Sequence, residues 1–346
     1  MVCDPDIAYQ LLATNTFRTV QRLKLQFRPF FRRNIATFFK LGSVEFPVLK
    51  SLKILDFHSR DFINDGLSMA HQFVPLFQAV SSTIEFFAAY CITVDLIPCC
   101  PKLKKFELLG FDGQLSEFSY AKFPSLLSIS IYSPTGRSRY LEKNFEPHTG
   151  VTEIRVRLLG RLMSKEEQIA EEYLHIFWNN LSRQFPNTKS IIILDTEPFN
   201  HATFRGVQQA FPHLVHLSIM SNCKCDFTLI SGMNMELVNE YLEAGLPFDS
   251  IPRRDSIFNF RELESLTLDA DVKITNDIIT HCLARIPKLK TVKFYWDASL
   301  SAQNIRDFLN HVINITIVIY DFYRICKDQL ALLKTLSNVH LHESHL

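Results

Sequence analysis

The sequence predicts an α/β solenoid, in which short parallel strands line a concave face and helices cover the convex face of a curved horseshoe. Three observations favour this fold. The motif apolar-x-x-apolar-x-apolar recurs along most of the chain, its copies follow one another at short intervals, and an apolar residue plus proline precedes six of them. Because an array of repeats adds core one unit at a time, 346 residues suit a single array.

The motif predicts the strands. Ten copies are strict, and they begin at Val20, Leu49, Leu103, Leu126, Val151, Leu214, Leu263, Leu289, Val312 and Leu336. Two degenerate copies, Ser81-Ile84-Phe86 and Thr188-Ile191-Ile193, have a polar first position. Seven of the eleven gaps between first positions lie between 22 and 26 residues. Since alternate residues of a strand point to opposite sides, we expect the apolar positions to be buried and those between them to face outward.

The proline pairs predict where each strand is introduced. They are Phe46-Pro47, Cys100-Pro101, Phe123-Pro124, Phe185-Pro186, Phe211-Pro212 and Ile286-Pro287. Proline cannot continue a helix, and it disfavours helical geometry in the residue before it. Each pair therefore predicts the end of a helix and a turn into a strand, with the apolar partner packed beneath that strand.

Helices are predicted between the strands. Ser164-Lys-Glu-Glu167 is typical of a capping box, and apolar residues follow it at four-residue spacing to Phe185. Thr275 and Ser301 predict the starts of two shorter helices. Residues 1–16 are expected to hold an N-terminal helix, either a cap or the remnant of a preceding repeat. Residues 17–346 are expected to form about twelve irregular repeats, with an insertion near 221–255 that either is a plain insertion or hides a thirteenth repeat.

These motifs resemble leucine-rich repeats of the ribonuclease-inhibitor-like kind, and especially the irregular repeats of F-box proteins. Cys100-Pro-Lys-Leu103-Lys-Lys-Phe106-Glu-Leu108 looks most like that form, in which Cys-Pro or Phe-Pro introduces the strand. The sequence departs from the family because the Asn or Cys that usually follows the strand is mostly absent, and no F-box is visible. The resemblance implies a protein-binding module, and for the F-box relatives the substrate-recognition part of a ubiquitin-ligase adaptor.

Composition and motifs argue against other classes of function. The formal charge of +1 makes duplex nucleic acid an unsuitable partner. No GxSxG, HExxH, GxxxxGK[ST] or GxGxxG stretch occurs, so we expect neither an enzyme nor a cofactor. No apolar run approaches the ~20 residues that span a bilayer, so no membrane partner is expected. The N-terminus lacks the features of a secretory signal, which predicts a cytoplasmic protein, with the nucleus as the alternative.

Two groups of residues invite a metal hypothesis. His340 and His342 would share one side of the last strand, with His345 following, and Cys223 and Cys225 lie in the insertion. Side chains on an exposed strand are usually solvated, and the cysteine spacing does not suit a zinc knuckle. We therefore expect no metal.

The outward strand positions are the candidate binding surface. Basic side chains dominate these positions in the first half, and tyrosines follow two strand cores as candidate anchors: Arg22, Lys24, Lys53, Lys105, Arg155, Arg157, Tyr132 and Tyr295. Such a strip would attract an acidic or phosphorylated segment of another protein, and reversing Lys105 and Arg155 to Glu should slow association without unfolding the chain. The alternative is that these charges only keep exposed strands soluble.

Three functions remain open from the sequence. The first is the substrate-recognition part of an F-box-type ubiquitin-ligase adaptor, which would contact the ligase core if an F-box exists upstream in the gene product. The second is a scaffold or inhibitor that is independent of a ligase. The third is a regulator of a small GTPase that acts through a projecting arginine.

Overall fold

The structure of the chain is a computed structural model, and it describes residues 2–3, 16–27, 46–56, 74–90, 94–109, 117–133, 146–158, 167–195, 201–221, 227–268, 274–296, 300–312, 314–320, 322 and 325–342. The chain divides into two compact units. The N-terminal unit comprises residues 1–157 and 180–187, and the C-terminal unit comprises residues 158–179 and 188–346. Each unit contains parallel strands with helical segments beside them, so the α/β class is confirmed.

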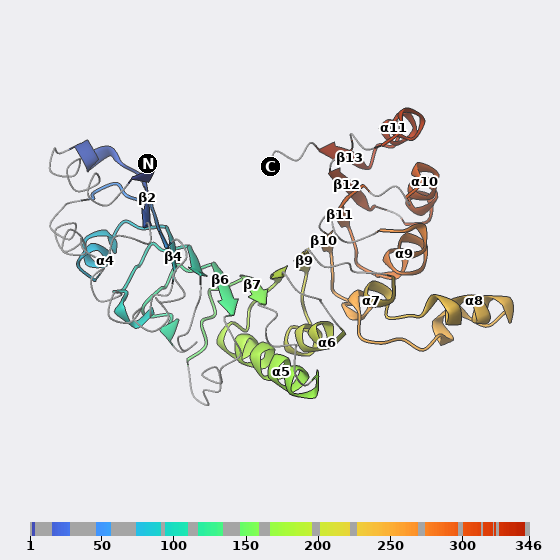
Figure 1. The fold of residues 1–346 in the computed structure, drawn as a ribbon, viewed down its shortest axis with the longest axis horizontal. Helices are drawn as coiled ribbons and strands as arrows, with labels where there is room; N and C mark the ends of the chain where they lie inside the picture. The colour runs from blue at the N-terminus through green and yellow to red at the C-terminus, as the bar shows by residue number, and fades with distance from the viewer. Residues whose placement is uncertain are drawn as a thin grey trace. The chain divides into compact units, whose positions relative to one another are not determined.

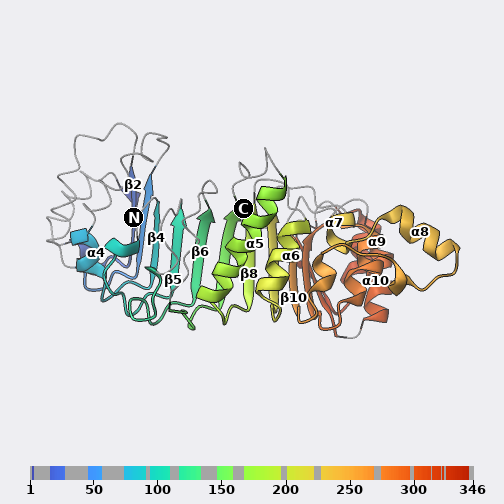
Figure 2. The same ribbon diagram turned by 90° about the horizontal axis from the view of Figure 1, so that it is seen from below.

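The N-terminal unit is a sheet whose strands follow one another in chain order from β1 to β7. The arrowheads of its labelled strands lie at the same end in Figure 2. Its described elements are β1 (Val2–Cys3), η1 (Thr16–Thr19), β2 (Arg22–Phe27), β3 (Ser51–Asp56), α4 (Val74–Val80), β4 (Phe86–Tyr90), η3 (Val94–Leu96), β5 (Lys105–Leu109), β6 (Ser128–Ser133) and β7 (Glu153–Leu158). Each recorded pairing is parallel.

The C-terminal unit repeats this arrangement with longer helices, and its strand order is β8 to β13. Helices α9, α10 and α11 lie along one side of strands β10 to β13 in Figure 1. Its described elements are α5 (Glu167–Gln184), β8 (Ser190–Asp195), α6 (His201–Ala210), β9 (His216–Ser221), α7 (Phe227–Ser231), α8 (Met235–Glu243), η6 (Phe248–Ser250), η7 (Ile257–Asn259), β10 (Ser265–Leu268), α9 (Asn276–His281), η8 (Leu283–Arg285), β11 (Thr291–Tyr295), α10 (Ala302–His311), β12 (Thr316–Tyr320), α11 (Lys327–Lys334) and β13 (Val339–His342). The last residues of α5 belong to the N-terminal unit.

The apolar positions of the motif form the core, as the alternation predicts. In β10, Leu266 and Leu268 are buried, whereas Ser265 and Thr267 between them are half-buried. Most of the other strict copies follow this rule, but the last one does not. Its Leu336, Val339 and Leu341 are only half-buried, because β13 is the end strand of the described sheet and pairs on one side only.

The turn before the strands is also as predicted. All six apolar residues that precede proline are buried, and in five cases the carbonyl of that residue accepts the amide of the residue three positions later at 3.1–3.3 Å. Proline suits the second position of such a turn because its φ angle is already fixed there. The apolar-proline pair therefore serves both the turn and the core.

Two copies of the motif lie at other positions than predicted. Residue Phe86 was expected to be buried in the Ser81 copy, but the register pairs Phe87 with Phe106 and Ala89 with Leu108. Phe87 and Ala89 take the buried positions of the motif, and Ala88 between them is buried as well, whereas Phe86 is half-buried and lies on the outward side. Every residue from 86 to 89 is apolar, so period-two alternation could not fix which side is buried.

The copy predicted from Val312 is displaced by two residues. Ile317 and Ile319 of β12 pair with Val292 and Phe294 of β11, so they take the second and third apolar positions. Ile315 is buried but precedes the strand. A shift of two residues leaves the same side of the strand buried. It also adds Tyr320 to the side chains of β12 that lie on the outward side.

The predicted helix starts are confirmed where the structure describes them. Thr275 Oγ1 accepts the amide of Ile278 at 3.3 Å at the start of α9, and Ser301 Oγ accepts the amide of Asn304 at 3.2 Å at the start of α10. The long helix is α5, although Ser164 lies outside the described residues. The N-terminal helix predicted within residues 1–16 falls on residues 4–15, which lie outside them as well, and the preceding β1 was not predicted.

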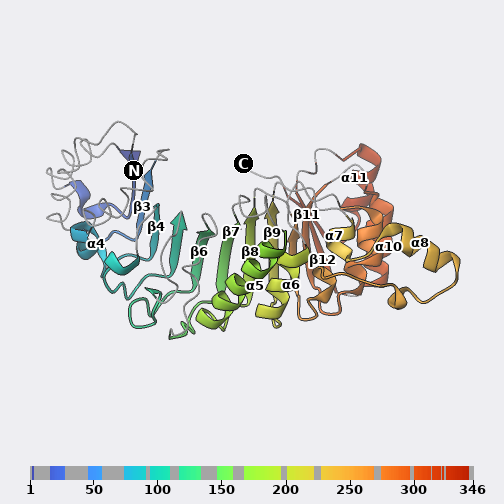
Figure 3. The ribbon, with the colours of Figure 1, turned by 60° about the horizontal axis from the view of Figure 1, so that its bottom comes forward.

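The described part of the insertion, from residue 227 onward, contributes helices and no strand. Residues 227–250 form α7, α8 and η6, and β9 pairs directly with β10 through His216 and Ser265. Within the described residues a hidden thirteenth repeat is therefore ruled out, because it would place a strand between these two. In Figure 3, α8 projects away from the strands of the C-terminal unit.

Aromatic rings fill the core of the N-terminal unit. Phe87 lies 5.3 Å from Phe77 and 5.2 Å from Phe106, and Phe106 lies 5.7 Å from Phe123, each distance measured between ring centroids. Such edge-on and tilted pairs stabilise by about 0.5–1.5 kcal/mol beyond area burial. The row joins successive repeats and so holds their strands in register.

Candidate functional site

The outward side of strands β2 to β7 carries the charged residues that the sequence singled out. We use the name outward strand face for the side chains of strands β2 to β7 that alternate with the buried ones. Lys24 and Lys53 are opposite each other on β2 and β3, and Lys105 is opposite Phe86 of β4. All four side chains are half-buried. Neighbouring repeats therefore bring residues that are far apart in sequence onto one surface.

Phe86 lies between two of these cations. The ammonium nitrogen of Lys53 lies 4.9 Å from the centroid of the Phe86 ring, and that of Lys105 lies 5.5 Å from it. The negative face of an aromatic ring attracts a cation at this range. The sequence interpretation missed Phe86 as a surface residue because it assigned that residue to the core. The parallel register with Lys105 would have been needed to identify it.

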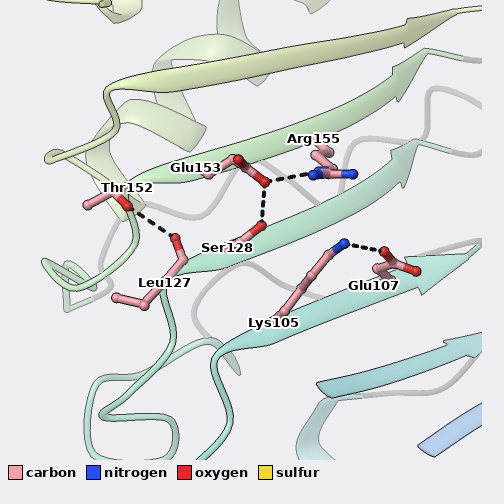
Figure 4. Close-up of polar contacts among 7 residues, drawn as sticks. All are labelled: Lys105, Glu107, Leu127, Ser128, Thr152, Glu153 and Arg155. Carbon is pink, nitrogen blue, oxygen red and sulfur yellow. Dashed lines mark hydrogen bonds and ion pairs between the residues drawn. The ribbon is translucent and has the colours of Figure 1, made fainter. Parts of the chain in front are cut away.

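Two of the predicted cations are neutralised by acidic neighbours on their own strands. Lys105 Nζ lies 2.8 Å from Glu107 Oε1 on β5, and Arg155 Nε lies 3.0 Å from Glu153 Oε1 on β7. Ser128 of β6 donates to the same Glu153 oxygen at 2.8 Å (Figure 4). This part of the outward strand face is an alternating network of charges.

The environment of Glu153 favours its ionised form. Partial burial alone would raise the pKa of this carboxyl, but hydrogen bonds from Ser128 and Arg155, with the positive charges of Arg155 and Lys105, hold the pKa below its usual value. A carboxylate that accepts two such bonds is stabilised in its charged form. The network is thus a structural feature of the folded N-terminal unit at neutral pH.

The remaining predicted residues of the N-terminal unit have different positions. Arg22 is exposed at the start of β2, next to Lys24 two residues later, and Arg157 is half-buried on β7. Tyr132 lies in β6, but its side chain is outside the part of the chain that the structure describes.

Tyr295 belongs to the C-terminal unit and lies in an aromatic row there. Its ring centroid is 5.2 Å from that of Tyr320, which is 6.0 Å from the imidazole centroid of His342. The three residues share one register position of β11, β12 and β13. Tyr320 was missed because the copy of the motif at Val312 was misplaced by two residues.

The two groups of residues that were weighed as metal ligands lie only in part within the described residues. His340 and His342 are both exposed on β13, whereas Cys223, Cys225 and His345 lie outside the described residues. Over the described ranges, no three His, Cys, Asp or Glu side chains come together in a way that could hold a metal ion.

Comparisons with known proteins assign the chain to no family. No protein-family model matches the chain, and no curated protein matches it. Among the helices that the structure describes, none is long and apolar enough to cross a membrane.

Proposed function

We propose that the chain is a leucine-rich-repeat protein of the ribonuclease-inhibitor-like kind, and that it binds another protein through its outward strand face. Two features support this proposal. Parallel strands follow one another in chain order in each unit, and the same apolar-proline turn introduces five of them. A curved array, with strands on the concave side and helices on the convex side, is part of the proposal.

The observation that carries the binding proposal is Phe86 between Lys53 and Lys105. An aromatic side chain on a strand face gives a partner a large contact area, and aromatic residues dominate the energetics of interfaces. The ammonium group of Lys53 beside it would favour a carboxylate or phosphate on that partner. We therefore propose an acidic or phosphorylated segment as the ligand of this face.

The ion pairs narrow the proposed contact region. Lys105 and Arg155 already have carboxylate partners, Glu107 and Glu153. Lys24 and Lys53 lie on two other strands of the same face, β2 and β3. Among the described residues, an incoming anion would compete with an existing carboxylate partner at Lys105 and at Arg155. The region formed by Lys24, Lys53 and Phe86 is thus the best place for the partner's charge.

We propose three alternative biological roles for the chain. The preferred form is substrate recognition in an F-box-type ubiquitin-ligase adaptor, which requires an F-box elsewhere in the gene product. The alternatives are a ligase-independent scaffold or inhibitor, and a regulator of a small GTPase. In each form the chain acts by binding and not as an enzyme, in the cytoplasm or in the nucleus.

Affinity purification with paired variants would test the binding proposal. The wild-type chain, a Lys24→Glu/Lys53→Glu variant and a Phe86→Ala variant would be used as bait, with Lys102→Glu/Lys189→Glu as a control at two exposed turn positions. We expect a partner that the wild type and the control retain and that both face variants lose. Partners that all four baits retain equally would contradict binding through this face.

Two further measurements separate the settings. Co-purification of the ligase's linker subunit with the full-length gene product would support the adaptor form. Stimulated GTP hydrolysis by a co-purifying GTPase would support the regulator form. A specific partner with neither result would leave the scaffold or inhibitor form.

A further inference from the structure

Helix α8 of the insertion is a well-formed helix that projects away from the strands of the C-terminal unit (Figures 1 and 3). At its start, Asn234 Oδ1 accepts the amide of Glu236 at 2.8 Å. At its end, Gly245 has φ +65°, and the amide of Leu246 donates to Tyr241 O at 2.9 Å. This is the hydrogen bonding of a Schellman cap, so the helix ends at a defined place and Leu246 is held beside its last turn.

The base of the insertion is anchored to the repeat behind it. Val238 of α8 is buried, and so is Phe248, whose ring stacks on His281 with 5.0 Å between the ring centroids. The amide of Arg254 donates to Gly232 O at 2.7 Å, so the chain leaves and re-enters the unit at one place. A surface that is held before binding loses little freedom when a partner arrives.

The exposed side of α8 combines acidic and apolar side chains. Glu236, Glu240 and Glu243 are all exposed, and their spacing of four and three residues places them on one side of the helix. Leu242 and Leu246 are 49% and 47% exposed. We use the name α8 patch for Glu236, Glu240, Leu242, Glu243 and Leu246.

The segment that carries the α8 patch supplies no cation of its own. Residues 226–252 include five acidic residues and no Lys, Arg or His. Like charges one turn apart on a helix repel each other, and a positively charged surface against them would relieve that repulsion. A partner that suits the α8 patch therefore combines cations with apolar contact area.

The outward strand face of the N-terminal unit offers this combination. Lys24 and Lys53 are opposite each other on β2 and β3, and the Phe86 ring on β4 lies 4.9 Å from the Lys53 ammonium nitrogen. The lengths match as well. Glu236 and Glu243 are seven residues apart, which is about 10 Å along a helix, and β2 and β4 are separated by two strand spacings, also about 10 Å.

We propose that the α8 patch of one copy of the chain docks on the outward strand face of a second copy. The glutamates would pair with Lys24 and Lys53, and the two leucines would cover Phe86. The inference rests on the proposed function, because it names a partner for that face. The two surfaces in contact are different, so a dimer still offers one of each, and association continues into rings or filaments as the concentration rises.

Sedimentation velocity of the full chain at about 1–200 µM tests the proposal, because small interfaces dissociate at such concentrations. We expect the wild type to change from a monomer to larger species over this range. Lys24→Glu/Lys53→Glu and Glu240→Lys/Glu243→Lys should each weaken self-association by about tenfold or more, because attraction becomes repulsion at two positions. Lysines in the last turn of a helix favour the helical state, so the second variant should keep α8, which circular dichroism would verify.

Exchange of the charges gives the decisive comparison. A single chain with all four substitutions should regain self-association, since both surfaces have changed sign. A mixture of the two double variants should also associate where neither does alone. Recovery of this kind cannot arise from a loss of folding in either double variant.

Matched controls test the specificity of the contact. Lys102→Glu/Lys189→Glu reverses two charges at exposed turns and should leave self-association unchanged. Leu242→Ala should weaken it, whereas Leu127→Ala, at a residue of the N-terminal unit that is 50% exposed, should not. Equal effects of the two leucine variants would contradict the assignment of the α8 patch.

Two results would overturn the inference. One is a wild type that stays monomeric throughout the concentration range, and the other is a chain with all four substitutions that associates no better than the double variants. A monomeric wild type whose face variants still lose another protein in affinity purification would leave the proposed function intact and refute only the docking between copies.

Discussion

Lys53 of β3 and Phe86 of β4 form a cation–π contact across neighbouring strands, with 4.9 Å between the ammonium nitrogen and the ring centroid. A contact of this kind on a partly exposed surface stabilises by about 0.5–1 kcal/mol. It links two repeats that lie more than thirty residues apart in the sequence.

This contact can be measured by a double-mutant cycle. Lys53→Met and Phe86→Leu, singly and together, should give a coupling free energy of about 0.5–1 kcal/mol in urea denaturation. The exposed Lys102→Met in the turn before β5 is a matched control and should change the free energy of unfolding by little. A coupling indistinguishable from zero would show that the two side chains do not stabilise each other in solution.

The ion pairs change how charge reversals should be chosen. Lys105→Glu and Arg155→Glu would each place a carboxylate beside an existing one, on Glu107 and on Glu153. We now expect this double variant to lose stability, contrary to the prediction from the sequence that folding would stay intact. Thermal unfolding should show a lower midpoint than that of Lys24→Glu/Lys53→Glu, and equal midpoints would contradict the importance of the pairs.

Glu153 should make the stability of the N-terminal unit depend on pH. Its pKa is lower in the folded chain than in the unfolded chain, so its contribution is present above the unfolded value of about 4.3 and is lost as the pH falls through the folded value. Glu153→Gln should therefore destabilise at pH 7 and less so near pH 4. Glu146→Gln, at an exposed position of the same unit, should have little effect at either pH. A Glu153→Gln effect that is the same at both pH values would show that its charge is not responsible.

Leu266 of β10 tests the predicted core. Its side chain is fully buried, so Leu266→Ala should lower the free energy of unfolding by about 2–5 kcal/mol through loss of contacts and formation of a cavity. Leu242→Ala on α8 removes the same atoms from a residue that is 49% exposed, and it should cost far less. Chemical denaturation measures the free energy of unfolding of both variants. Similar losses of that free energy at the two sites would place Leu266 outside the core.

The cysteines should differ in reactivity. Burial raises the pKa of the Cys100 thiol to about 12, and it does the same to Cys282. The thiolate is the reactive form, so iodoacetamide at pH 8 should modify the exposed Cys99 and Cys326 at least about tenfold faster than these two. Mass spectrometry of individual peptides gives the rates, and denaturant should remove the difference. Equal rates in the folded chain would contradict the burial of Cys100 and Cys282.

The pattern of the sequence predicted the strands and turns because these depend on local chemistry. Leu-x-x-Leu-x-Leu around Leu266 places two side chains on one side of any strand, and Phe123-Pro124 ends the preceding segment whatever surrounds it. Thr275 and Ser301 cap their helices with their own hydroxyl groups. Each of these features needs only a few neighbouring residues.

Tertiary structure alone decided which residues meet on the outward strand face and at the turns before β10 and β11. The run Phe86-Phe87-Ala88-Ala89 offers apolar side chains on both sides, so only the pairing of Phe87 with Phe106 places Phe86 outward beside Lys53. Arg261 and Arg285 lie 24 residues apart, and the sequence shows nothing that would join them. Their proximity arises because β10 and β11 pair side by side, which brings the turns before both strands together. Local patterns fix the elements, whereas contacts between distant residues depend on how those elements stack.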